Sequence, residues 1–129
     1  MNEGDLVVDA SAVIAFLVGE PFTRFDGERL GNALISTVNL SEVLARLPEI
    51  GVPERETAAA IARLNLRIVA FDESQARAAA RLRPVTRQAG LSLGDRACLA
   101  LGNARGCPVV TADRSWASLD IGVEVILIR

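Results

Sequence analysis

Apolar and polar positions divide this chain into short runs with different periodicities. Several runs are almost wholly apolar, rich in Val, Ile and Leu, and bounded by Gly, Pro, Asn or Asp. Such runs are typical of strands that are covered on both faces, as in a parallel sheet. They predict five strands, at residues 6–9, 33–37, 68–71, 108–111 and 123–128.

Between these strands, apolar residues recur at helical spacing, and polar residues precede them as candidate caps. Ser11, Asn39, Asp72 and Ser92 are each expected to cap a helix, and Pro53 suits the first turn of another. The helices are predicted at residues 11–18, 25–30, 39–47, 53–64, 72–89, 92–106 and 115–117. Strands that alternate with helices indicate the α/β class, with a doubly wound parallel sheet and helices on both of its faces.

Four acidic residues lie where a predicted strand ends or a predicted helix begins. Asp9 closes the first strand, and Asp113 follows the fourth. Glu42 and Asp95 lie in the first turns of two helices. A parallel sheet brings such positions to the carboxyl edge of its strands, where ligands bind in this class of fold. Gathered carboxylates repel one another unless protons or a cation neutralise them. The chain has no histidine, so an oxygen-preferring ion, Mg²⁺ or Mn²⁺, is the expected occupant.

The two acids that follow strands also have purely structural interpretations. Asp9 would begin the turn before a helix, and Asp113 would cap the short helix that comes after it. Ser11 and Thr111 each lie two positions from one of these acids, so their hydroxyls would hold a metal-bound water or orient a carboxylate. The alternatives are a helix cap for Ser11 and an ordinary strand hydroxyl for Thr111.

The two acids on helices each lie three positions after a residue that commonly caps helices. This is the spacing of a capping box, in which the acid binds the backbone of the cap; the two pairs are Asn39–Glu42 and Ser92–Asp95. A carboxylate in the first turn of a helix can still point at a metal, so the two roles are compatible. Four acids that one topology brings together are stronger evidence for a site than any one of them.

Length and composition limit the classes of protein to which this chain can belong. The 129 residues, 50% of them hydrophobic, predict one domain, residues 1–129, with an ample core. The net charge of −2 does not by itself indicate a nucleic-acid-binding protein, although all 14 basic residues are Arg, whose guanidinium group suits phosphate.

Cys98 and Cys107 are expected to be buried and reduced, as in a cytoplasmic protein. The acidic N-terminus lacks the basic region of a signal peptide, and no apolar run approaches the roughly 20 residues of a membrane span.

Four stretches of the chain, at residues 7–12, 39–44, 91–97 and 110–113, resemble in sequence and order the motifs of PIN-domain ribonucleases of the VapC toxin type. The resemblance implies a PIN-like three-layer α/β/α sandwich with a parallel sheet of about five strands. It also implies a Mg²⁺-dependent endoribonuclease, with Mn²⁺ able to substitute, whose RNA substrate is often structured, as tRNA is. A VapB-type antitoxin and a homodimer are implied as partners, with the antitoxin tail lying across the helices that contain residues 43–47 and 58–64.

The resemblance also assigns roles to individual residues. The catalytic and metal-binding role falls on the four acids, Asp9, Glu42, Asp95 and Asp113. Thr111 joins them as a catalytic residue, and Ser11 supports them. Some family members carry a further acid shortly after the last one, whereas the next acid of this chain is Asp120, which we leave outside the site.

Other classes of protein share part of this pattern. A receiver domain has an acidic metal pocket on a similar sheet, but it needs a Lys near the last strand, and this chain has none. A haloacid-dehalogenase phosphatase normally carries a second acid two residues after the first, where this chain has Ser11. The main alternative is a PIN-like scaffold that binds RNA or protein without catalysis. Arg96 and Arg114, each next to a site acid, would bind RNA phosphates or serve as solvent-exposed or ion-pair residues.

Overall fold

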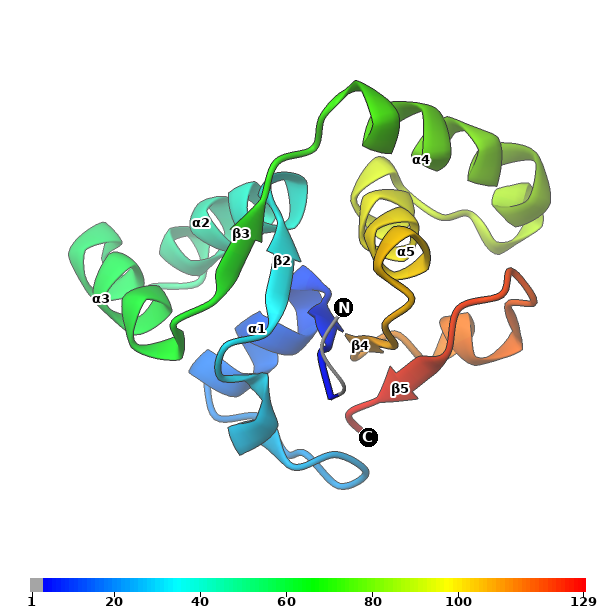
Figure 1. Ribbon diagram of the computed structural model, residues 1–129. Helices are drawn as coiled ribbons and strands as arrows, with labels where there is room; N and C mark the ends of the chain where they lie inside the picture. Colours follow the sequence, from blue (N-terminus) through cyan, green and yellow to red (C-terminus); the bar gives the residue numbers. More distant parts are fainter. Residues whose placement is uncertain (1–3) are drawn as a thin grey trace.

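A five-stranded, wholly parallel sheet forms the centre of the computed structural model, which describes residues 4–129 (Figure 1). The strands are β1 (Val7–Val8), β2 (Leu34–Ser36), β3 (Arg67–Val69), β4 (Val109–Thr111) and β5 (Val125–Leu127). Their order is β3-β2-β1-β4-β5, so β1 is central and the chain order reverses between β1 and β4. The predicted parallel α/β sandwich is therefore confirmed, and β1 and β4 flank its switch point. Residues 1–3, the start of the acidic N-terminus noted above, lie outside the described residues.

Helices connect the strands close to the predicted positions. The α-helices of residues 4–129 are α1 (Ala10–Leu17), α2 (Thr37–Glu49), α3 (Glu54–Leu64), α4 (Glu73–Thr86) and α5 (Leu93–Arg105). The 3₁₀ helices are η1 (Gly27–Leu30), η2 (Arg87–Ala89) and η3 (Arg114–Ser118). Helix α4 packs along α5 on the outside of the molecule, while α2 and α3 lie together near the β3 edge (Figure 1).

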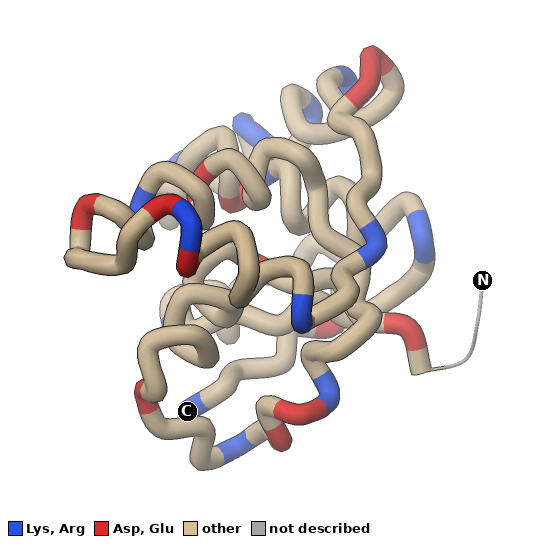
Figure 2. The backbone as a smooth tube through the Cα atoms, turned by 90° about the vertical axis from the view of Figure 1, so that its left-hand side faces the viewer, with Lys and Arg blue, Asp and Glu red and all other residues tan. Residues whose placement is uncertain are grey.

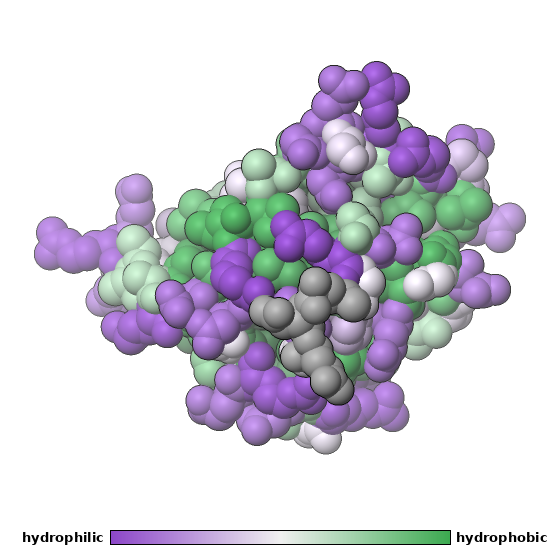
Figure 3. All heavy atoms as spheres, in the orientation of Figure 1, coloured by the Kyte–Doolittle hydropathy of each residue, from purple (hydrophilic) through white to green (hydrophobic). Residues whose placement is uncertain are grey.

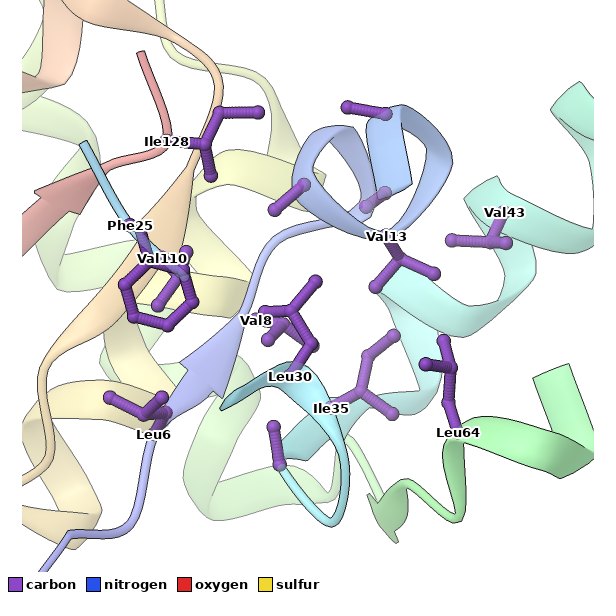
Figure 4. Close-up of a cluster of buried hydrophobic side chains, with 14 of the residues drawn as sticks. Leu6, Val8, Val13, Phe25, Leu30, Ile35, Val43, Leu64, Val110 and Ile128 are labelled. Carbon is purple, nitrogen blue, oxygen red and sulfur yellow. The ribbon is translucent and has the colours of Figure 1, made fainter. Parts of the chain in front are cut away.

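The two residues of β1 point to opposite faces of the sheet, and both are fully buried. Val8 belongs to an apolar cluster with side chains of α1, α2 and α3, which Figure 4 shows in close-up. Val7 belongs to a second cluster, which contains side chains of α5 and Trp116 of η3. Packing from both sides fixes the position of β1, and therefore of Asp9, the residue that follows it.

Helix starts agree with the predicted caps at two places and differ at two others. Asp72 and Ser92 cap α4 and α5 as predicted. The predicted cap roles of Ser11 and Asn39 are wrong, because both residues lie inside their helices. The cap of α2 is Ser36, the last residue of β2. In both cases the helix begins almost directly after a strand, so its first turn lies earlier than the cap pattern indicates.

Some apolar side chains remain on the surface, where green and purple regions alternate in Figure 3. Leu44 and Ile50, on and next to α2, are 45% and 41% exposed, and Ile68 on the edge strand β3 is 56% exposed. Val43 and Leu47 instead face the core. Acidic and basic residues are interspersed along the tube in Figure 2. Within residues 4–129 no helix combines the length and the apolar character needed to cross a membrane.

Candidate functional site

An open cavity of about 410 Å³ lies at the carboxyl edge of the sheet, beside the switch point. Side chains of α1, α2 and α5 line it together with the end of β1. Three of the four predicted acids contribute to its wall: Asp9, Glu42 and Asp95. Asp113 is not among the lining residues.

Asp9 is 5% exposed, and a network of hydroxyl groups fixes its carboxylate. Ser11 Oγ donates to Asp9 Oδ2 at 2.6 Å, and Thr111 Oγ1 donates to the same oxygen at 2.9 Å. Because each hydroxyl proton is used on Asp9, both hydroxyl oxygens act as acceptors elsewhere. They accept from the backbone N–H groups of Ala112 and Asp113, at 3.0 and 3.1 Å. The two hydroxyls therefore orient the carboxylate, one of the two roles predicted for them.

The surroundings of Asp9 raise its pKa from the usual 3.8 to about 6. Burial is the largest cause, since it disfavours the charged form. The hydrogen bonds from Ser11 and Thr111 act in the opposite direction, and the negative charges of Asp95 and Glu42 raise the pKa further. The same three carboxylates, after burial, raise the pKa of the buried Cys98 thiol. The negative charges of the three acids thus act on a common region of the protein.

Asp95 combines the two roles that its spacing allows. Its Oδ2 accepts from the Ser92 N–H at 2.9 Å, and Ser92 Oγ accepts from the Asp95 N–H at 3.1 Å. This capping box at the start of α5 confirms the structural interpretation. The Asp95 side chain nevertheless lines the cavity, because the first turn of α5 lies at its wall.

Glu42 extends into the cavity from α2 and is exposed to solvent. Its Oε1 accepts from the side-chain amide of Asn39 at 2.9 Å. The predicted capping box of this pair is wrong, because Ser36 caps α2 and Asn39 lies within the first turn. The Asn39 amide also donates to the backbone oxygen of Gly94, at 3.0 Å, and so links α2 to α5.

Asp113 has the structural role that was its alternative interpretation. Its Oδ1 accepts from the Ser115 N–H at 2.9 Å and from Ser115 Oγ at 2.7 Å, which caps η3. The side chain is exposed, and the predicted ligand role of Asp113 stays a prediction.

The carboxylate oxygens of the cavity suit a hydrated divalent cation. Within residues 4–129 no protein group donates a hydrogen bond to Asp9 Oδ1, Glu42 Oε2 or Asp95 Oδ1, so each acid keeps one oxygen available. No three His, Cys, Asp or Glu side chains of this described part are close enough to enclose an ion directly. Mg²⁺ usually keeps several of its waters and takes only one or two carboxylates directly, so these acids would hold it partly through water.

Two charged residues of the cavity were not singled out from the sequence. Arg46 and Glu49 lie on the cavity wall, four and seven positions after Glu42 on α2. Residues at this spacing share one face of a helix with Glu42, so the helical period of the sequence could have identified them. The cavity therefore carries four acids and one arginine.

The two arginines that were considered as phosphate contacts lie elsewhere. Arg96 Nη1 donates to the backbone oxygen of Ala79 at 3.0 Å, which ties α5 to α4. Arg114 Nε donates to the backbone oxygen of Arg129 at 3.4 Å. Both side chains thus make structural contacts, and neither lines the cavity.

Solved structures similar to this chain include several toxin–antitoxin proteins. VapBC from Salmonella typhimurium, bound to DNA, is 19% identical, with 94% of this chain and 96% of that chain covered and a TM-score of 0.72. VapC20 from Mycobacterium tuberculosis, a toxin that cleaves the sarcin-ricin loop, is 18% identical, with coverage of 93% and 99% and a TM-score of 0.68. A toxin–antitoxin complex from Klebsiella pneumoniae is 17% identical, with coverage of 97% and 98% and a TM-score of 0.67. At these identities the likeness shows a shared fold.

The sequence itself identifies the family. No curated protein matches the chain. The sequence model of the PIN domain, however, matches residues 6–122, a span that includes β1, the switch point and every residue of the cavity. The protein therefore belongs to the PIN domain family.

Proposed function

We propose that this protein is a metal-dependent endoribonuclease and the toxin of a VapBC-type toxin–antitoxin system. The observation that carries the proposal is the buried carboxylate of Asp9, held at the switch point in the negative field of Asp95 and Glu42. Burying a charge among like charges is costly unless a cation balances them. Membership of the PIN domain family and the likeness in fold to VapC toxins support the same activity.

In this proposal Asp9, Glu42 and Asp95 hold the cation through their available oxygens. A divalent ion, when bound, would lower the pKa of a water molecule and neutralise negative charge on the phosphoryl group. Because Ser11 and Thr111 both donate to Oδ2 of Asp9, the other carboxylate oxygen, Oδ1, remains available for the cation. With a pKa of about 6, Asp9 is mostly ionised at neutral pH and is ready to bind a cation.

Other groups of the cavity act on the RNA rather than on the ion. Arg46 presents a guanidinium group at the wall, where it binds a phosphate that flanks the cleaved bond. Asp113 adds its negative charge from outside the cavity, while its carboxylate remains engaged with Ser115. Structured RNA such as tRNA is the proposed substrate class.

The proposed partners are a VapB-type antitoxin and a second copy of this chain. The similar structures from Salmonella typhimurium and Rickettsia felis are VapBC proteins bound to DNA, which supports an antitoxin partner. The acidic cavity suits a basic side chain of the antitoxin, because a cationic group there replaces the metal ion and blocks the RNA phosphate.

The direct test is cleavage of a folded RNA, such as a tRNA mixture, by the purified protein in Mg²⁺ and in EDTA. Cleavage in Mg²⁺ or Mn²⁺ that stops in EDTA and returns on metal addition is expected. The matched Asp9→Asn variant keeps the shape of the side chain and removes its charge, so it should be inactive. If no RNA is cleaved with either metal, a non-catalytic PIN-like scaffold becomes the better account.

A further inference from the structure

Asn39 is a fully buried polar residue in the first turn of α2, and its amide group serves two helices. The Nδ2 group donates to Glu42 Oε1 at 2.9 Å and to the backbone oxygen of Gly94 at 3.0 Å. Both partners are acceptors, so only the NH₂ end of the amide can face them. The opposite end, Oδ1, is buried and has no hydrogen-bond partner within residues 4–129. An apolar side chain would avoid this unpaired acceptor, which indicates that the two donated bonds have a use.

Gly94 provides the second half of the same arrangement. A Cβ atom placed on Gly94 would lie 2.6 Å from Glu42 Cδ and would overlap both carboxylate oxygens. Gly94 is not among the residues of positive φ, so its backbone conformation does not require glycine. The missing side chain is what leaves room for the Glu42 carboxylate against the start of α5.

We propose that Asn39 and Gly94 form a seat that fixes the carboxylate of Glu42 against the first turn of α5, next to Asp95. Glu42 is a long and exposed side chain, and without the seat it would sample many rotamers. The seat holds Glu42, the acid of α2, at the same cavity wall as Asp95, the acid of α5. Asn39 and Gly94 are therefore positioning residues that act through Glu42. This inference rests on the proposed metal-dependent activity for its functional consequence, but the seat itself can be observed without activity.

Gly94→Ala is the sharpest variant, because its structural and functional effects have opposite signs. Alanine favours a helix more than glycine does, and the group that it would overlap is the end of a flexible side chain that can move away. We expect a melting temperature equal to or above that of the wild type, and an affinity for Mn²⁺ that is about tenfold lower, as for other changes behind a metal ligand. Asn103→Ala, an exposed change on the same helix, should keep the wild-type affinity.

A double-mutant cycle shows whether Gly94 acts through Glu42. In a Glu42→Ala background the carboxylate is already absent, so adding Gly94→Ala should not lower the Mn²⁺ affinity further. Asn39→Leu is the second variant, since it keeps the approximate size of the side chain and removes the amide. It should remain folded, lose about tenfold in Mn²⁺ affinity, and lower kcat for RNA cleavage with KM unchanged.

The side-chain amide signals of Asn39 in ¹⁵N–¹H spectra report on the seat directly. They should shift in Gly94→Ala and in Glu42→Ala, and remain in place in Asn103→Ala. The seat is refuted if these signals do not respond, or if Gly94→Ala and Asn39→Leu bind Mn²⁺ as the wild type does. If the seat responds and Mn²⁺ binds but the wild type cleaves no RNA, the seat stands and the proposed function fails. If the wild type binds no Mn²⁺, the functional role of the seat falls with the metal site.

Discussion

Asp9 and Asp113 follow neighbouring parallel strands, β1 and β4, yet their carboxylates lie in opposite environments. Asp9 is buried, accepts hydrogen bonds from two hydroxyls and lines the cavity. Asp113 is exposed, and Ser115 donates two hydrogen bonds to it. The end of a strand fixes where the Cα atom lies, but the nearest donors decide where the carboxylate points.

The comparison separates an acid that stabilises the fold from one that does not. A capping aspartate such as Asp113 satisfies backbone groups at the start of a helix and needs no further explanation. Asp9 makes no capping bond to α1, although it occupies the N-cap position. Its burial near two other acids raises its pKa and costs folding free energy. A residue kept at such a cost is better evidence for a metal site than an acid with a structural task.

The largest expected difference between the two acids is in RNA cleavage. Asp9→Asn should lower kcat/KM by about 100-fold or more, because it removes charge that a metal ion needs, which is worth several kcal/mol in the transition state. Asp113→Asn should lower it by less than about tenfold, since an exposed charge outside the cavity is screened by solvent. Initial rates on one RNA substrate at saturating Mg²⁺ measure both. Equal losses in the two variants would show that the acids act together.

Asp9 should contribute a pH dependence to the stability of the protein. Its pKa is raised in the folded state, so between about pH 4 and pH 6 the folded protein binds more protons than the unfolded chain. The free energy of unfolding should therefore decrease as the pH rises through this window. The shift from 3.8 to about 6 corresponds to about 3 kcal/mol.

Urea denaturation in EDTA at a series of pH values measures this contribution as the free energy of unfolding of the wild type minus that of Asp9→Asn. The difference should be pH-dependent in the window and constant above it. Asp113→Asn, at an exposed acid outside the cavity, is the matched control and should retain the decrease that Asp9 causes. A flat difference between wild type and Asp9→Asn would mean that Asp9 is not held in a desolvated environment.

Thr111→Val tests the hydroxyl network that distinguishes the two acids. The change keeps the shape of the side chain, removes a donor to Asp9 and leaves the N–H of Asp113 without its acceptor. It should cost about 1–3 kcal/mol of stability, and it should raise the pKa of Asp9 further, because the lost bond lowers that pKa. The matched control is Thr86→Val. Thr86 is also buried, and its hydroxyl donates only to a backbone oxygen within α4. This control should leave the titration of Asp9 unchanged.

The smallest effect is expected at the cap of η3. Asp113→Ala removes the acceptor of the Ser115 bonds and should cost about 1 kcal/mol. Asp113→Asn should cost less than half as much, because Asn and Asp are about equally good caps. Thermal unfolding of the two variants gives the comparison. A loss of stability in Asp113→Asn that equals the loss in Asp113→Ala would show that charge, rather than the capping bond, is what η3 needs.

Local patterns in the sequence predicted most of the fold. Apolar runs and alternating helices predicted each strand of residues 4–129 and the parallel sheet, and the position of Asp9 directly after the first strand was confirmed. The caps Asp72 and Ser92 were predicted from spacing alone, because a cap depends on residues within one turn. Two other caps were wrong, since Ser11 and Asn39 are equally suitable by type, and the direct passage from strand to helix is not visible in the residue types.

The site was predictable only as far as topology determines it. The sequence predicted that four acids gather at one edge of the sheet. Three of them, Asp9, Glu42 and Asp95, line one cavity in the structure, and Asp113 does not. The contact of Asn39 with Gly94 joins residues 55 positions apart, so no local pattern contains it. The direction of the Asp113 side chain depends on competition between a nearby cap and a distant cavity, which spacing does not resolve.

The central claim is that the buried carboxylate of Asp9, and not the exposed carboxylate of Asp113, binds the metal ion. Calorimetric titration of Mn²⁺ into the wild type, Asp9→Asn and Asp113→Asn tests it most directly. The wild type and Asp113→Asn should bind with similar affinity. Asp9→Asn should bind at least about tenfold more weakly, because it loses a proposed ligand rather than a group behind one. Equal affinity in the wild type and Asp9→Asn, or a loss confined to Asp113→Asn, would contradict the account.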